Sequence, residues 1–265
     1  MRSMTWTACV ATILTLCAAA RLAEAATVTL FEDDFNSGTL APANWTVYTG
    51  QTSPAPQIVS GVLQMNDSRD GIRTAGQFNP ADYASMTISF RFISSQHVDS
   101  GAILGVMTDY VGGNPSGQQF GAPINNGLRF ILYDRPSGLG NAWRVGQVSG
   151  GTTTWLSIDE DDNIQILPDG WTMSANDVID YAVTIAGNTW KVDAHNVTQN
   201  ITASLDGTFS FTPTHYHANL SSHNNVVHRY DNFKITAQEI PEPSTLALML
   251  ICGIGAAFFW KRSGK

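Results

Sequence analysis

The sequence predicts an all-β fold, an antiparallel sandwich or barrel, over residues 26–239. Apolar and polar residues alternate with a period of two in many short runs, and in residues 86–92 every second side chain is apolar. Turn clusters such as Gly112-Gly113-Asn114-Pro115 separate the runs. No stretch of this region keeps an amphipathic helical period over ten residues. Many short strands with such turns are typical of sandwiches and barrels with Greek-key connections.

The expected strands follow one another at short intervals along the chain. In most of them an apolar residue occupies every second position, which places the apolar side chains on one face of the strand. The expected strands are 28–31, 59–65, 86–92, 102–107, 128–133, 143–148, 179–185, 190–195 and 230–236.

The composition of residues 26–239 limits the classes of function that are open to this region. The region is long enough for one domain with a full core, and it carries 9 Lys and Arg against 20 Asp and Glu, a net charge of −11. Because nucleic-acid binding requires cations that neutralise phosphates, this balance argues against a nucleic-acid partner. Cys9, Cys17 and Cys252 all lie outside the region, so it contains no disulfide, thiol nucleophile or thiolate metal site.

The first 25 residues have the order of a secretory signal peptide. Arg2 gives a positive start, and residues 7–20 form an apolar core that we expect to be helical. Ala23-Glu24-Ala25 is a small-x-small cleavage site before Ala26. We therefore expect export of the chain and removal of residues 1–25.

The other end of the chain has three parts in order: the box Pro241-Glu242-Pro243, an uncharged apolar run at 246–260 and a basic tail at 261–265. The run is shorter than the roughly 20 residues that a helix crossing a bilayer needs. This order resembles the PEP-CTERM sorting signal of Gram-negative exported proteins. The resemblance implies a single transmembrane helix at 246–260 that holds the chain at the inner membrane. It also implies an exosortase that removes residues 240–265, and a destination at the cell surface or in the extracellular matrix.

Two short motifs carry a second resemblance. The opening LFEDDF at 30–35 and the closing YDNFKI at 230–235 resemble the ends of concanavalin A-like, laminin-G-like jelly rolls. Galactose-binding-like jelly rolls end similarly and remain an alternative. The resemblance implies an antiparallel jelly-roll sandwich over 26–239, with its first and last strands adjacent in one sheet. Fold alone does not fix function.

Four carboxylates meet at one sheet edge if the first and last strands pair. Their repulsion favours a bound cation, and calcium takes six to eight oxygen ligands from carboxylates and carbonyls. One expectation is therefore a structural calcium. The other is that Asp33 and Asp231 cap strands and bond backbone amides. The four residues are Glu32, Asp33, Asp34 and Asp231.

The sequence contains no complete catalytic motif. Residues 26–239 hold only Glu32, Glu160 and Glu239, so the E-x-D-x-x-E signature of jelly-roll glucanases is absent. No Gly-x-Ser-x-Gly nucleophile elbow is present either. His215 and His217 fall on one face of a strand. We expect that face to be polar and exposed to solvent, with a metal or sugar contact as the alternative.

Aromatic residues beside polar loops are the remaining functional signal. Exposed rings on a concave sheet stack on sugar faces, and nearby Asp and Arg bond hydroxyl groups. Trp155 and Trp171 flank the acidic run 159–163, and Tyr133-Asp134-Arg135 joins an apolar strand to a polar turn. We therefore expect these five residues to bind a polysaccharide.

Taken together, the sequence predicts an exported, non-catalytic, glycan-binding protein of the cell surface or matrix. Two alternatives stay open. One is a carbohydrate-active enzyme of the same jelly-roll fold, and the other is a purely structural surface protein without a ligand.

Overall fold

The computed structural model describes residues 25–48, 54–66, 70–95, 101–110, 124–134, 141–156, 165–166, 171, 173–210, 215–222 and 227–240. A compact unit, Val28–Ala237, contains the folded domain. The predicted signal peptide except its last residue, the Pro241-Glu242-Pro243 box and the apolar run 246–260 lie outside the described residues. Among the described residues, no helix has the length and apolar character that crossing a membrane requires.

The described residues form two antiparallel sheets and one short 3-10 helix, η1 (Pro80–Asp82). The strands are β1 (Thr27–Asp33), β2 (Trp45–Tyr48), β3 (Gln57–Val59), β4 (Val62–Met65), β5 (Gly71–Thr74), β6 (Tyr83–Ile93), β7 (Gly101–Tyr110), β8 (Ile124–Asp134), β9 (Asn141–Ser149), β10 (Thr152–Trp155), β11 (Gln165–Ile166), β12 (Val178–Ala186), β13 (Thr189–Asn196), β14 (Ile201–Thr208), β15 (His217–Ser221) and β16 (His228–Glu239).

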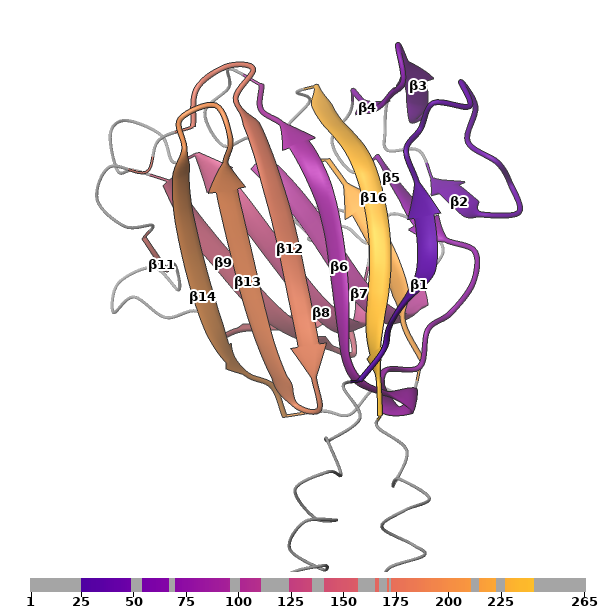
Figure 1. Ribbon diagram of the computed structural model, residues 1–265, viewed down its shortest axis with the longest axis vertical. Coiled ribbons are helices and arrows are strands. Elements are labelled where there is room, and N and C mark those ends of the chain that lie inside the picture. The colour runs from indigo at the N-terminus through magenta and orange to yellow at the C-terminus, as the bar shows by residue number, and fades with distance from the viewer. Residues whose placement is uncertain are drawn as a thin grey trace, which may run out of the picture. The chain divides into compact units, whose positions relative to one another are not determined.

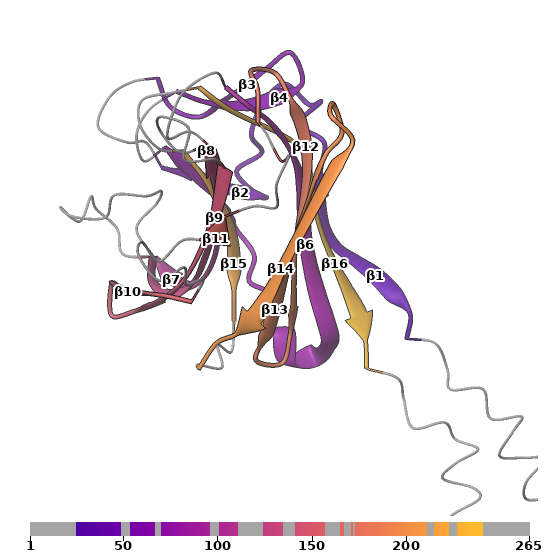
Figure 2. The same ribbon diagram turned by 90° about the vertical axis from the view of Figure 1, so that its left-hand side faces the viewer.

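The two sheets pack face to face as a sandwich. Sheet A, which faces the viewer in Figure 1, has the order β14-β13-β12-β6-β16-β4-β3, and β1 also pairs with β16. Sheet B has the order β10-β9-β8-β7-β15-β5-β2, with β11 paired to β9. The edge-on view of Figure 2 shows the two layers. The predicted all-β sandwich is confirmed, and so is the pairing of the first strand with the last.

The expected strand 59–65 is a hairpin of two short strands. Val59 at the end of β3 pairs with Val62 at the start of β4. Between them, Ser60 and Gly61 both have positive φ, 53° and 76°. This is the backbone of the tight two-residue turn that matches the twist of antiparallel strands. The alternating pattern therefore continued through the turn and concealed it.

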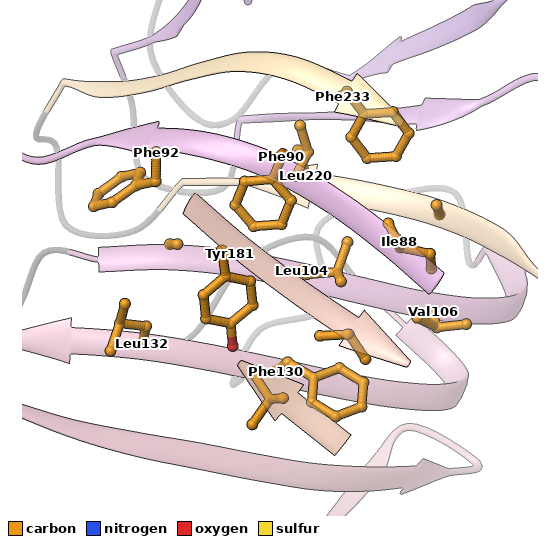
Figure 3. Packing of buried hydrophobic residues seen from close by; sticks show 14 of the residues in the cluster. Ile88, Phe90, Phe92, Leu104, Val106, Phe130, Leu132, Tyr181, Leu220 and Phe233 are labelled. Atoms are coloured by element: carbon orange, nitrogen blue, oxygen red, sulfur yellow. The ribbon is translucent and has the colours of Figure 1, made fainter. Parts of the chain in front are cut away.

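The hydrophobic core lies between the sheets and takes every second residue of the central strands. In β6 these are Ile88, Phe90 and Phe92, all buried. Figure 3 shows Phe90 beside Tyr181 of β12, and their ring centroids lie 5.1 Å apart. The alternation that predicted the strands is thus the alternation between core and outer face.

One hydroxyl group joins the two sheets through the core. Tyr230 of β16 in sheet A is fully buried, and its hydroxyl donates to the carbonyl oxygen of Ser221 in β15 at 2.7 Å. The same hydroxyl accepts from the amide of Ile103 in β7 at 3.2 Å. Burial raises the pKa of Tyr230, which keeps the hydroxyl protonated and able to donate.

We expect Tyr230→Phe to lower the free energy of unfolding by about 1–3 kcal/mol, because it leaves two buried backbone groups without their partner. Tyr181→Phe is the matched control. The Tyr181 hydroxyl is buried and has no hydrogen-bond partner among the described residues, so its removal leaves stability unchanged or slightly higher. Urea denaturation of both variants measures the difference. Equal losses of stability in the two variants contradict the bridging role of Tyr230.

Candidate functional site

The four carboxylates of the expected calcium site do not form a cluster. Within the described ranges, no group of three or more His, Cys, Asp or Glu side chains lies close enough to hold a metal ion. Instead, each carboxylate has a local partner. Glu32 lies 3.4 Å from the ammonium group of Lys234, and Asp34 accepts from the backbone and side-chain amides of Asn36, which lower its pKa.

Asp33 and Asp231 follow the other expectation and bond backbone amides. Asp33 accepts from the amide of Phe35 at 2.8 Å and from the indole of Trp45 at 2.6 Å. Asp231 accepts from the amide of Asn232 at 2.8 Å. These bonds fix the chain at the opening and closing motifs, so Asp33 and Asp231 have a structural role there.

Trp171 is not an exposed sugar platform. It is buried, with 5% of its surface accessible, and belongs to the hydrophobic core. The prediction was wrong because it used the position beside an acidic run, whereas burial is decided by tertiary packing. Tyr133 and Asp134 end β8, where Tyr133 pairs with Gly101 and Ala142. Arg135 and the acidic run lie outside the described residues.

Trp155 lies half-buried at the edge of sheet B, in β10. It pairs with Gly146 of β9, and its ring covers that glycine, since a β-carbon there would lie 3.1 Å from the ring. The guanidinium carbon of Arg144 lies 5.2 Å from the ring centroid, a cation–π contact. The ring therefore has a fixed position on the outer face of the sheet.

The outer face of sheet B carries polar side chains that are nevertheless buried. In β15, Ala218 and Leu220 point into the core, so the alternating residues His217, Asn219 and Ser221 point outward. All three are at most 6% exposed. The sequence prediction of a solvent-facing surface at His217 was therefore wrong, whereas His215 is exposed.

A single cross-strand row connects Trp155 with these residues. Strand register places Trp155 opposite Gly146, Gly146 opposite Arg129, Arg129 opposite Gly105, and Gly105 opposite Asn219. We call these five residues the outer row. Members two strands apart are about 10 Å apart. Gly105 and Gly146 carry no side chains, and the Trp155 ring and the Thr153 side chain fill the space over Gly146.

Arg129 brings a buried positive charge to the outer row. Its side chain is 3% exposed, and burial lowers its pKa to about 10. Tyr48 partly opposes this shift through its electrostatic interaction. The guanidinium group is therefore still charged at neutral pH.

Two polar atoms of β15, two strands away from Arg129 on the same face, have unused hydrogen-bonding capacity. The Asn219 amide nitrogen donates to the carbonyl oxygen of Ile72 at 2.8 Å, which leaves the amide oxygen facing away from the core. This oxygen and the hydroxyl of Ser221 are buried without a hydrogen-bond partner among the described residues. Because a buried polar atom without a partner is costly, this pair marks a place where a ligand or water gains bonds.

The sequence contained weak signals of this face. Arg129 interrupts an apolar strand, and the residues of β15 alternate strictly between polar and apolar. Such a pattern is typical of a strand with one core face and one polar face. It shows the polarity of the outer face, but it does not show that the face is buried or which strands lie beside it.

Comparisons with known proteins agree with this architecture. No protein-family model and no curated protein matches the chain. Among solved structures, the chain is similar to the CBM2 module of the evolved Dit protein of Lactobacillus casei BL23 phage J-1, with TM-score 0.55, 11% identity and coverage of 82% of this chain and 98% of the module. It is also similar to basic winged bean lectin in complex with Tn-antigen, with TM-score 0.54, 11% identity and coverage of 81% and 99%.

A third similar structure is the exoplasmic/lumenal domain of VIP36 bound to Ca²⁺ and Man3GlcNAc, with TM-score 0.53, 15% identity and coverage of 76% of this chain and 86% of that domain. These neighbours are lectin-like sandwiches. The chain therefore has the concanavalin A-like, legume-lectin-like fold, which the motifs at its two ends predicted. Identities this low establish the fold and leave the activity to be argued from the site.

His217 makes the outer face sensitive to pH. Its Nδ1 lies 2.7 Å from the carbonyl oxygen of Thr74, so Nδ1 carries the proton and donates. Burial, with a smaller contribution from the charge of Arg73, lowers the pKa of His217 below its ordinary value of 6.5. The neutral imidazole is thus the form that the fold favours.

We expect the contribution of His217 to stability to be complete above pH 6.5. It is lost as the pH falls through the lower pKa of the folded state, because the unfolded state then binds more protons. The melting temperature measured as a function of pH checks this. His217→Gln flattens the acid side of that profile, and the exposed His215→Gln control leaves it unchanged. A profile that His217→Gln does not alter contradicts the assignment.

Proposed function

We propose that the protein is an exported, non-catalytic glycan-binding protein whose sandwich binds polysaccharide on the outer face of sheet B. The observation that carries the proposal is the outer row with Ser221 beside it: buried polar atoms with bonding capacity, pointing away from the core. A sugar offers hydroxyl groups that both donate and accept, so it suits a face that combines a guanidinium with an amide oxygen and a hydroxyl. The lectin-like neighbours support the same ligand class.

The arrangement of the row fits an extended chain of sugars. Trp155 provides an aromatic ring at the sheet edge, and aromatic rings bind the apolar faces of sugars. Arg129 and Asn219 follow at intervals of about two strands, with glycines between them. We infer that a polysaccharide stacks on the half-buried Trp155. Arg129, Asn219 and Ser221 are at most 3% exposed, so it bonds them only where the covering of this face opens to admit it.

The test is a panel of polysaccharides incubated with the full chain and read both for retention of the protein and for released reducing ends. We expect retention by at least one polysaccharide without release. Ser221→Ala lowers that affinity roughly tenfold, the value of one hydrogen bond of about 1–1.5 kcal/mol. Trp155→Ala also weakens binding. The exposed Ser149→Ala, outside the row, leaves binding unchanged.

Because the Ser221 hydroxyl has no partner among the described residues, Ser221→Ala keeps the fold, and an unchanged melting temperature verifies this. Released reducing ends support the alternative of a carbohydrate-active enzyme and contradict the non-catalytic proposal. No retention by any polysaccharide supports a purely structural surface protein.

We further propose that the C-terminal segment sorts the protein, on the resemblance of residues 241–265 to the PEP-CTERM signal. In this scheme the run 246–260 holds the exported chain in the inner membrane with its basic tail on the cytoplasmic side. An exosortase then removes the segment near Pro241, and the domain reaches the cell surface or matrix.

Replacement of Pro241, Glu242 and Pro243 by Ala is expected to leave the full-length chain in the membrane fraction of a host that has an exosortase. The unaltered chain and a Ser244→Ala control appear at the cell surface without the segment. Fractionation with mass spectrometry of the C-terminus makes the comparison. Normal processing of the triple variant contradicts the sorting proposal.

A further inference from the structure

A groove of about 640 Å³ crosses the outer face of sheet A, on the opposite side of the sandwich from the outer row. This face looks toward the viewer in Figure 1. The groove runs over β14, β13, β12 and β6. With neighbouring strands about 4.8 Å apart, the distance across these four strands is roughly 14 Å. A groove of this length holds a short segment of an extended molecule.

The floor of the groove is formed by small side chains. Ser89 of β6 pairs with Ala182 of β12, and Ala182 pairs with Asp193 of β13. All three line the groove. Since Ser89 and Ala182 barely rise above the sheet, the larger residues of the adjacent rows stand as walls on either side. The small residues Ser89 and Ala182, neighbours in one cross-strand row, therefore create the depression.

Charged groups that line the groove are already oriented by partners. Arg91 binds Asp180 through two hydrogen bonds of 2.8 and 3.3 Å. Lys191 lies 2.8 Å from Asp193, which also accepts from the hydroxyl of Ser204 at 2.6 Å. Two cations and two anions face the groove, so their formal charges cancel. A charged polymer therefore gains no net attraction there.

Oriented ion pairs on a neutral surface are well suited to hydroxyl groups. Each carboxylate oxygen accepts more than one hydrogen bond, and a guanidinium has five N–H donors. One hydroxyl can donate to Asp180 while it accepts from Arg91. The methyl group of Ala182 on the floor meets the apolar C–H face of a sugar ring. The groove thus offers polar groups to the hydroxyl groups at the edge of a neutral sugar and an apolar surface to the C–H face of its ring.

The closing YDNFKI motif contributes to the same groove. Asn232, which lines it, has a φ of 51°, a conformation that a non-glycine residue rarely adopts without cause. Its backbone amide and side-chain amide both donate to Asp231, at 2.8 and 3.2 Å. This local distortion of β16 adds a polar side chain from a fifth strand to the lining of the groove.

We propose that this groove is a second glycan site, specific for neutral, hydroxyl-rich chains, and that the domain is bivalent with one site on each outer face. The ligand class rests on the proposed function, whereas the location rests on the groove alone. Bivalent binding lets one molecule join two polysaccharide chains, and linked sites raise the overall avidity by about 10²–10⁴-fold over one site. The protein then acts as a cross-linker of a polysaccharide matrix.

The location is tested by NMR on the ¹⁵N-labelled full chain, titrated with neutral oligosaccharides of glucose, mannose, galactose and xylose. We expect two separate sets of amide shifts, one around Ser89, Ala182 and Asp193 and one around Asn219 and Ser221. Shifts at the second set alone overturn this inference and keep the proposed function. Shifts at the first set alone keep this site and contradict the proposed one. Shifts at neither overturn both.

A variant that fills the groove tests bivalency. Ala182→Tyr places a ring on the floor, and Thr208→Tyr is the control, at an exposed position of β14 outside the groove lining. Light scattering follows cross-linking of the soluble polysaccharides that retain the protein. We expect scattering with the unaltered chain and with Thr208→Tyr, and its loss with Ala182→Tyr. Equal scattering from all three overturns bivalency.

Two further measurements exclude other occupants. Binding to the groove is expected to persist at high salt, because screening weakens only interactions between net charges. Alginate is an anionic polysaccharide. If the protein prefers alginate and this binding disappears at high salt, the neutral ligand class is overturned. Sedimentation shows whether Ala182→Tyr changes the mass of the protein. Conversion of a dimer into a monomer identifies the groove as a contact between copies and overturns the inference.

Discussion

The hydroxyl group of Tyr230 bonds the backbones of two strands in the opposite sheet, and the outer face of sheet B depends on that connection. Its carbonyl partner belongs to Ser221, whose own hydroxyl lies on the outer face. Its amide partner belongs to Ile103, which is opposite Ser221 in the register. The core therefore fixes the backbone of the residue that the glycan is proposed to meet. Pre-organised groups of this kind bind a ligand with less loss of entropy.

The two outer faces differ in how they present polar groups. Sheet B buries an arginine, an asparagine and a serine, and the asparagine oxygen and serine hydroxyl lack hydrogen-bond partners among the described residues. Sheet A exposes ion pairs, each with side-chain exposures between 38% and 53%, and such pairs contribute little to stability. On sheet A, the proposed site rests on the shape of the groove and on its neutral charge. On sheet B, it rests on buried polar atoms that lack hydrogen-bond partners among the described residues. The same fold thus supports two separate kinds of polar surface.

Period-two alternation was sufficient to predict the sandwich, because apolar residues at every second position identify the buried face of each strand. The run 179–185 lies within β12 and misses one residue at each end, and the run 86–92 lies within the longer β6, Tyr83–Ile93. The site was predicted less well. Trp155 is on the outer face of sheet B, whereas Trp171 is in the core, and nothing local to either tryptophan distinguishes them. Asn219 and Arg129 share a cross-strand row only through the register of β15, β7 and β8, which depends on pairings distant in the sequence.

The pairing of β1 with β16 has a consequence for how the chain folds. Glu32 and Lys234, which contact across these strands, are 202 residues apart in the sequence. The first strand therefore has no neighbour in its sheet until nearly the whole domain has been synthesised. Folds with such long-range pairing form slowly, because the chain must close a large loop before the contact stabilises it. Until β16 has been synthesised, β1 therefore exposes unpaired backbone groups that can pair with another chain.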